Sequence, residues 1–196
     1  MAIDFLVVGL GNPGKQYART RHNVGEETVG ILAARNSATM RSGRDDALVA
    51  ECSINSRQVA LAFPLTFMND SGRSVQALMR RYHLKDPLQL IIVHDELDLP
   101  PSVVRVKAGG GLAGNNGLRS ITQHLHTQDY VRVRIGIGKP PSKERGAAHV
   151  LSKLSKAERE EMDVAVQLAA DAVEVIVGEG VDAAQRRFNS TTHDPS

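Results

Sequence analysis

The chain has 196 residues and a formal net charge of +2, a length that predicts one domain with one substantial core. No run approaches about 18 uninterrupted apolar residues, and no basic segment followed by a long apolar stretch opens the chain, so we expect neither a membrane span nor a signal peptide. The one cysteine, Cys52, excludes an internal disulfide and a cysteine-based metal cluster, and it favours a reducing cytoplasm.

The first part of the chain predicts a strand, a helix and then a hairpin. Ile3 to Val8 is an apolar run typical of a buried strand, and Val24 to Ala34 spaces its apolar residues with the period of a helix. Ala47 to Ile54 and Gln58 to Phe63 flank Asn55-Ser56 at hairpin distance, which predicts two antiparallel strands.

The middle of the chain continues the alternation of helices and strands. Ser71 to Tyr82 predicts a helix, with the polar residues just before it available as caps. Leu88 to Val93 is continuously apolar, which predicts a central strand covered on both faces and ending at His94-Asp95-Glu96. Val103 to Lys107 predicts another extended strand, and Gly117 to Leu125 suits a short helix.

The next apolar segment, Tyr130 to Gly138, alternates with period two. This pattern predicts a strand whose apolar residues face the core, while Arg132 and Arg134 face away from it. Three glycines before it, from Gly109 to Gly111, predict a hinge or a tight loop.

The last part of the chain predicts helices. Ser155 and Glu158 form the pattern of a capping box at the start of a long amphipathic helix, and Val181 to Phe188 predicts a short one. The elements together predict the α/β class: a single domain over residues 1–188, built on a twisted mixed β-sheet flanked by helices. Residues 189–196 are predicted to form a polar C-terminal tail.

The run Gly9 to Gly14 fits the pattern G-x-G-x-x-G of dinucleotide-binding loops. Such a site also needs a helix opening on the glycines and an acidic residue at the tip of the second strand. Here Lys15 to Asn23 has no helical apolar stripe, and Arg35-Asn36 ends the next element without an acid. The run is therefore better explained as a turn, either purely geometric or carrying groups that act on a ligand.

The charges are unevenly distributed along the chain. Residues 105–145 contain eight Lys or Arg and two acidic residues, whereas residues 156–182 contain two basic and eight acidic residues. A basic segment in a nearly neutral chain favours a polyanionic partner bound on one face. The alternative is that these charges only solvate strands and loops.

Polar groups follow several of the predicted strands at their carboxyl ends. Asn12 and His22 follow the first strand, Asn69 follows the hairpin, and Asp95 follows the central strand, while Asn116 opens a helix. Ligands of open α/β sheets bind at this edge. The residue types suit hydrolysis, because the histidine can take a proton from water, the carboxylate can orient the histidine, and a carboxamide can stabilise an oxyanion. Taken singly, each is better explained as a cap, a turn or a solvated loop residue, and it is their joint placement that favours a site.

The remaining histidines give no sign of a metal site. They show no zinc spacing with a third ligand nearby, and we interpret most of them as surface or packing residues: His83, His94, His124, His126 and His149. We expect no bound metal.

Several motifs in a fixed order carry a specific resemblance over nearly the whole chain. They are Gly9 to Gly14 with Tyr17, Thr20 to Gly25, Thr66 to Asn69 with Ser71-Gly72, His94 to Pro100, Gly109 to Ile121 and Arg132 to Gly138. Together they resemble the bacterial peptidyl-tRNA hydrolases. The resemblance implies a cytoplasmic, monomeric enzyme with no cofactor that hydrolyses the ester between a peptide and the 3′ ribose of tRNA, and so recycles tRNA.

The resemblance also implies roles for individual residues. His22 would be the catalytic base, Asp95 would support its basic form, and Asn12 would help to distinguish peptidyl-tRNA from aminoacyl-tRNA with its charged α-amine. The residues implied to line the cleft for the peptide and the tRNA 3′ end are Tyr17, Phe67, Met68, Asn69, Asn115 and Asn116. The residues implied to receive tRNA phosphate are Arg105, Lys107 and Arg134.

One loop departs from the family pattern. The family usually reads Gly-His-Asn-Gly where this chain reads Gly114-Asn115-Asn116-Gly117. Asn115 can form hydrogen bonds but cannot become cationic near neutral pH, so we expect activity to be retained with an altered pH dependence or affinity. The alternative functions are a module that binds the tRNA acceptor end without catalysis and, on the glycine pattern alone, a dinucleotide enzyme.

Overall fold

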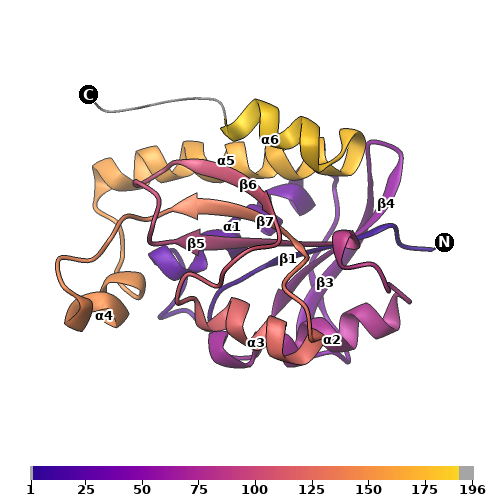
Figure 1. The fold of residues 1–196 in the computed structure, drawn as a ribbon, viewed down its shortest axis with the longest axis horizontal. Helices are drawn as coiled ribbons and strands as arrows, with labels where there is room; N and C mark the ends of the chain where they lie inside the picture. Colours follow the sequence, from indigo (N-terminus) through magenta and orange to yellow (C-terminus); the bar gives the residue numbers. More distant parts are fainter. Residues whose placement is uncertain (1, 190–196) are drawn as a thin grey trace.

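Seven strands form one mixed sheet in the computed structural model, which describes residues 2–189 (Figure 1). The order across the sheet is β2-β3-β4-β1-β5-β7-β6. The strands are β1 (Phe5–Gly9), β2 (Arg41–Ser42), β3 (Ala47–Ile54), β4 (Arg57–Pro64), β5 (Leu90–Glu96), β6 (Val104–Ala108) and β7 (Val131–Gly136). The neighbours β4-β1, β1-β5 and β5-β7 are parallel, so the carboxyl ends of these four strands share one edge of the sheet.

Helices cover both faces of the sheet, as expected for the α/β class (Figure 1). The α-helices are α1 (Val24–Arg35), α2 (Ser71–Arg81), α3 (Asn116–Leu125), α4 (Gly146–Val150), α5 (Lys156–Glu179) and α6 (Val181–Asn189). Short 3-10 helices are η1 (Arg21–Asn23), η2 (Met68–Asp70), η3 (Pro87–Gln89) and η4 (Lys143–Arg145). The single α/β domain with a mixed sheet flanked by helices is therefore confirmed.

The sheet separates two hydrophobic cores, because residues of a strand point alternately to opposite faces. On one face Val7, Ile91 and Val133 pack with α1, α5 and α6. On the other face Val8 and Ile92 pack with α2 and α3. In Figure 1, α5 and α6 lie above the sheet and α2 and α3 below it.

Most element predictions are confirmed to within a few residues. The hairpin pairs β3 with β4 in antiparallel register, and the turn residues Asn55 and Ser56 both have positive φ. The capping box of α5 is present, since Ser155 Oγ accepts from the Glu158 N–H and the Glu158 carboxylate accepts from the Ser155 N–H. By contrast, no side chain caps the start of α2, where Ser71 Oγ instead donates to the Met68 carbonyl.

The central strand β5 runs further than its apolar segment predicts. It begins at Leu90, after the 3-10 turn η3, and continues through His94, Asp95 and Glu96, which are all buried. These three residues pair with Arg134 to Gly136 of β7, so the backbone ladder carries the strand past the point where its side chains become polar. As a result Asp95 is held by strand geometry and not by a loop.

Arg132 does not face away from the protein, contrary to the alternation pattern. It is only 2% exposed, because the face it points to is covered by Tyr130 and by the glycine loop that precedes α3. Its guanidinium donates to the carbonyls of Gly110, Gly111 and Gln128 and lies 4.7 Å from the centre of the Tyr130 ring. Arg132 is therefore the residue that fastens the glycine loop to the sheet.

Two further predictions concern the C-terminal tail and membrane-spanning helices. The predicted tail, residues 189–196, lies outside the described residues except for Asn189, which ends α6. None of the helices in residues 2–189 is long and apolar enough to cross a membrane.

Two glycines of α1 give opposite predictions for substitution by alanine. A Cβ on Gly25 would overlap the Val93 carbonyl oxygen and the Leu10 backbone, so Gly25→Ala should lower the free energy of unfolding by about 1–3 kcal/mol. Gly30 has no atom near the position of a Cβ, so Gly30→Ala should raise it by up to about 1 kcal/mol. Urea unfolding measures both changes, and equal effects would show that α1 does not press on β5 in this way.

Candidate active site

A cavity of about 260 Å³ opens at the carboxyl edge of the parallel strands, where ligands of such sheets bind. His22 and the carboxyl end of β5 form one wall, and the loop before α3 forms another. The segment Gly146 to Val150 of α4 closes a third side. The lining residues that carry polar side chains are His22, Asp95, Glu96, Asn115 and Asn116.

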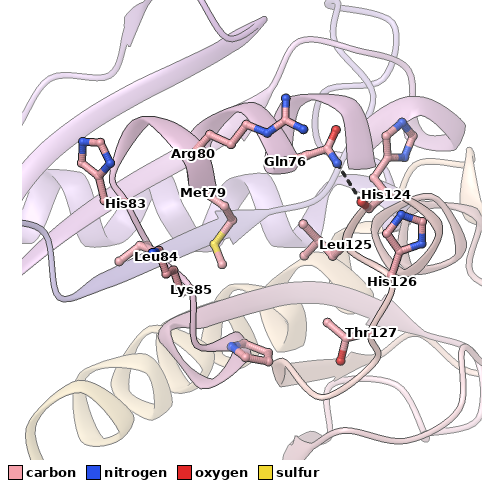
Figure 2. A pocket seen from close by; sticks show the side chains of 11 residues that line it. Gln76, Met79, Arg80, His83, Leu84, Lys85, His124, Leu125, His126 and Thr127 are labelled. Atoms are coloured by element: carbon pink, nitrogen blue, oxygen red, sulfur yellow. Dashed lines mark hydrogen bonds between the residues drawn. The ribbon is translucent and has the colours of Figure 1, made fainter.

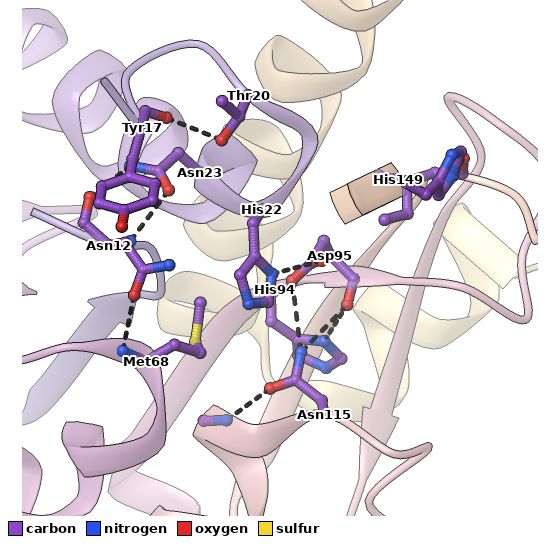
Figure 3. A network of polar contacts seen from close by, with 12 residues as sticks. Asn12, Tyr17, Thr20, His22, Asn23, Met68, His94, Asp95, Asn115 and His149 are labelled. Carbon is purple, nitrogen blue, oxygen red and sulfur yellow. Dashed lines mark hydrogen bonds and ion pairs between the residues drawn. The ribbon is translucent and has the colours of Figure 1, made fainter. Parts of the chain in front are cut away.

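His22 and Asp95 are in direct contact. His22 Nδ1 lies 2.7 Å from Asp95 Oδ2, and their side chains are 12% and 3% exposed (Figure 3). Because the carboxylate accepts the Nδ1 proton, the neutral ring keeps Nε2 unprotonated. The pair therefore has the arrangement of a general base oriented by a carboxylate.

The short helix η1 holds His22 in place through both of its neighbours. On one side, Arg21 Nη2 lies 2.6 Å from Glu158 Oε2 of α5, and the Arg21 guanidinium also donates to Ser152 Oγ and to the Lys153 carbonyl. On the other side, Asn23 is fully buried. The imidazole is thus carried on backbone that is anchored to two other parts of the fold.

The pKa of His22 is raised above 6.5. Burial alone lowers it by disfavouring the charged ring, but the charge of Asp95 and the hydrogen bond to it outweigh burial. Burial lowers the pKa of His94 to about 4, so this neighbour stays neutral near neutral pH. Burial raises the pKa of Glu96, which lies 3.8 Å from Arg134 Nη1. His22 is therefore the imidazole of the cavity whose charged form is favoured by a carboxylate partner.

Asn12 is held by the backbone and by Asn23. The Met68 N–H donates to Asn12 Oδ1 at 2.7 Å, while Asn23 accepts from the Asn12 N–H and donates to the Asn12 carbonyl. With Oδ1 used in this way, the amide nitrogen of Asn12 points to the side of His22 (Figure 3). Within residues 2–189, no hydrogen-bond acceptor is found for that nitrogen, so it is available to a ligand.

Asn115 lies on the other side of His22 and contacts Asp95. Its Nδ2 is 3.3 Å from Asp95 Oδ1, and its Oδ1 accepts from the N–H groups of Gly117 and Leu118. Asn115 is therefore the N-cap of α3. Asn116, the first residue of the helix, is exposed and lines the cavity.

The predicted cleft residues divide into two groups around His22. Asn115 and Asn116 share the cavity with Asp95, whereas Asn12 and Met68 lie on the opposite side of His22 (Figure 3). In the second group Tyr17 and Phe67 form an edge-to-face pair with ring centres 6.5 Å apart, and Phe67 is 60% exposed. Asn69 follows them on η2 with an exposed side chain.

The three basic residues predicted to receive phosphate lie on β6 and β7. Arg105 and Arg134 are cross-strand partners, but the Arg105 guanidinium donates to the Phe188 carbonyl of α6. Lys107 is half-buried, and its side chain passes over Gly110. The three side chains therefore come from two neighbouring strands at one side of the sheet, the edge strand β6 and its partner β7.

A larger cavity, of about 470 Å³, lies between the C-terminal ends of α2 and α3 (Figure 2). Met79, Leu84 and Leu125 give it an apolar floor, and His83 and His126 stand at its rim. It lies at the opposite end of α3 from Asn115, and it lacks a coupled acid and base like His22 and Asp95. Size is therefore a poorer guide to chemistry here than the polar contacts.

Sequence analysis missed two residues of the site. Arg21 and Asn23 flank His22 in the run Thr20 to Asn23, but nothing in the spacing indicates that one binds α5 and the other holds Asn12. No group of three or more His, Cys, Asp or Glu side chains within residues 2–189 is arranged to hold a metal ion.

Comparisons with known proteins agree on one family. A family model described as peptidyl-tRNA hydrolase matches residues 6–196. A peptidyl-tRNA hydrolase from Nocardia farcinica is 48% identical over 188 residues, covering 94% of this chain and 95% of that protein. One from Frankia alni is 46% identical over 186 residues, covering 95% and 94%. The crystal structure of peptidyl-tRNA hydrolase from Acinetobacter baumannii superposes with a TM-score of 0.91 at 40% identity, covering 97% of each chain.

Replacing Asp95 by Asn should lower the pKa of His22, because burial would then act without the opposing charge. A raised pKa in the folded state stabilises the protein fully below the unfolded value of 6.5, and this contribution is lost as pH rises through the folded pKa. The stability lost in Asp95→Asn should therefore be larger near about pH 6 than near about pH 9.

NMR titration of the His22 ring proton and urea unfolding at the two pH values measure these effects. Asp98→Asn is the matched control. Asp98 is an exposed carboxylate just beyond the same strand, and it pairs with Lys139 and not with His22. A His22 pKa that stays unchanged in Asp95→Asn would contradict the assigned coupling.

Proposed function

The chain belongs to the peptidyl-tRNA hydrolase family, and on that premise we propose that His22 activates the water that cleaves the ester of peptidyl-tRNA. The observation that carries the proposal is the 2.7 Å contact between His22 Nδ1 and Asp95 Oδ2 at the carboxyl edge of the sheet. It leaves Nε2 free to act as a base, on a residue that lines the cavity.

The proposed reaction balances with one water and one ester. Nε2 of His22 takes a proton from water, and the water oxygen forms a bond to the carbonyl carbon that joins the peptide to the ribose. Asp95 stabilises the imidazolium that results. When the bond to the ribose oxygen breaks, Nε2 returns the proton to that oxygen, so that tRNA leaves with a 3′-terminal hydroxyl and the peptide as a carboxylic acid.

Carboxamides are proposed to stabilise the negative oxygen formed during attack. The amide nitrogen of Asn12 points to the His22 side with its oxygen already occupied by the Met68 N–H, and Asn116 is exposed in the cavity. One such donor contributes about 2.7–4 kcal/mol and general base catalysis about 10²–10⁴-fold, amounts that suit a reactive ester better than an amide. Asn12 would also disfavour a free, charged α-amine, since an amide N–H group repels a cation.

The aromatic pair is proposed as a platform for the 3′ end of tRNA. Phe67 is 60% exposed and Tyr17 packs edge-to-face against it, while the next residue, Met68, is buried in the core shared with α2 and α3. Stacking of a base on such a ring contributes about 1–3 kcal/mol without demanding a particular sequence. Asn69 stands beside the platform and can supply hydrogen bonds.

The tRNA body is proposed to reach the edge formed by β6 and β7. Lys107 and Arg134 are half-buried there, so both keep part of the side chain available to phosphate. The Arg105 contact with α6 makes its contribution depend on whether that contact opens. We further propose that the enzyme acts as a cytoplasmic monomer, as the family resemblance implies.

His22→Ala should reduce the turnover of an N-blocked aminoacyl-tRNA by about 10²–10⁴-fold while leaving its affinity unchanged, because the base is lost but the binding surfaces remain. Single-turnover release of the blocked amino acid and a separate binding assay measure the two quantities. His126→Asn, at an exposed histidine of the distant cavity, is the control that should behave as wild type. Weakened binding with unchanged turnover of the bound complex would contradict the role of His22.

Replacing both Lys107 and Arg134 by Ala should raise KM for peptidyl-tRNA much more than for a short peptidyl ester without the tRNA body. The slope of log affinity against log salt should fall by about 0.7–0.9 for each lost phosphate contact. Lys156→Ala, at an exposed lysine starting α5, controls for the loss of charge. Equal changes in KM for the two substrates would show that Lys107 and Arg134 serve the fold only.

A further inference from the structure

Asn115 uses both ends of one carboxamide, and each end has a different partner. Its oxygen accepts from the Gly117 N–H at 2.9 Å and from the Leu118 N–H at 3.1 Å. Its nitrogen faces Asp95, 3.3 Å from Oδ1 and 3.4 Å from the backbone carbonyl. The opposite orientation of the amide would place NH₂ against two backbone N–H groups and oxygen against a carboxylate, so the fold permits only this one.

Asp95 needs a second donor at this position. The side chain is almost fully buried, and its Oδ2 is taken by His22. A buried carboxylate oxygen without a partner is costly, and the amide of Asn115 supplies that partner to Oδ1. Asp95 therefore accepts from His22 with Oδ2 and from Asn115, the N-cap of α3, with Oδ1.

From this geometry we propose that Asn115 is a positioning residue, whose carboxamide holds the Asp95 carboxylate in line with His22 and ties both to the N-terminus of α3. The inference rests on the proposed function for its catalytic meaning, although the contact itself does not. It differs from the role in substrate binding that the family resemblance implies, because the nitrogen of Asn115 is already directed to Asp95.

The other charged and titratable groups near His22 and Asp95 have partners of their own. They are Arg21 with Glu158, Glu26 with Asn23, Glu27 with Arg159, His94 with the Asp95 carbonyl, Glu96 with Arg134, Asp98 with Lys139, Arg132 with the glycine loop, and His149 with the carbonyls of Ile137 and Gly138. The group that reaches the free oxygen of Asp95 is therefore neutral. A neutral donor keeps the carboxylate in place without adding a cation that would oppose protonation of His22.

Two substitutions at neighbouring positions separate this contact from a general effect of charge. Asn115→Asp keeps an N-cap of α3 but replaces the donor with a negative oxygen against Asp95. Asn116→Asp adds the same charge at the next residue, which lines the same cavity but forms no hydrogen bond with Asp95 among the described residues. Acidic residues are favourable at both positions of a helix N-terminus, so both variants should fold.

The experiment is an NMR titration of the His22 ring proton in the wild type and both variants, with the signal assigned by its loss in His22→Ala. Asn115→Asp should raise the pKa of His22 by about one unit or more, and Asn116→Asp by less than half as much. The rising limb of kcat/KM against pH for peptidyl-tRNA should move to higher pH by the same amount in Asn115→Asp, because the base must be unprotonated.

Equal shifts in the two variants, or no shift in Asn115→Asp, would overturn the positioning role. A change confined to KM for peptidyl-tRNA, with His22 titrating as in the wild type, would also overturn it and assign Asn115 to substrate binding. If the wild type releases no peptide at any pH while the His22 pKa still moves in Asn115→Asp, the proposed function fails and the positioning role stands.

Discussion

One hydrogen bond between positions 73 residues apart, His22 Nδ1 to Asp95 Oδ2, constrains the rest of this structure. A carboxylate as buried as Asp95 must be paired, and its partner must arrive from a different part of the chain. Parallel pairing of β1 with β5 brings the two segments to one edge, and Gly25 allows the start of α1 to lie against the Val93 carbonyl. The backbone contacts of η1 with the segment before α5 then fix where the imidazole stands.

The charged groups around this pair are paired elsewhere, so that Asp95 is the carboxylate that acts on His22. Arg21 precedes His22 in the chain, and Arg134 pairs with His94 across the sheet. Yet each guanidinium is directed to a carboxylate other than Asp95, Arg21 to Glu158 and Arg134 to Glu96. His94 is adjacent in sequence to Asp95, but burial keeps it neutral. The pKa of His22 is therefore raised by the charge of a single carboxylate, Asp95, and not by a network of charges.

The elements of the fold were predictable wherever local pattern determines them. Three elements were predicted from patterns that lie within a short stretch of sequence: α1 from its apolar spacing, the hairpin from its turn residues, and the start of α5 from the Ser155–Glu158 capping box. Arg132 shows the limit, because alternation says which face a side chain takes but not whether other segments cover that face. β5 shows another, since its last residues are in the strand through pairing with β7, a contact that no local pattern contains.

The site was predictable as a set of residues but not as a set of contacts. His22, Asp95 and the asparagines could be placed at one edge by counting strands, whereas the direction of each amide depends on distant backbone N–H groups. Asn12 and Asn115 show why this matters: a backbone donor occupies the oxygen of each, so that each presents a nitrogen. One nitrogen points to the side of His22 and the other faces Asp95. Because carboxamides do not titrate, the fold can in this way offer one N–H donor beside His22 and hold the Asp95 carboxylate with another, without adding a group whose charge changes with pH.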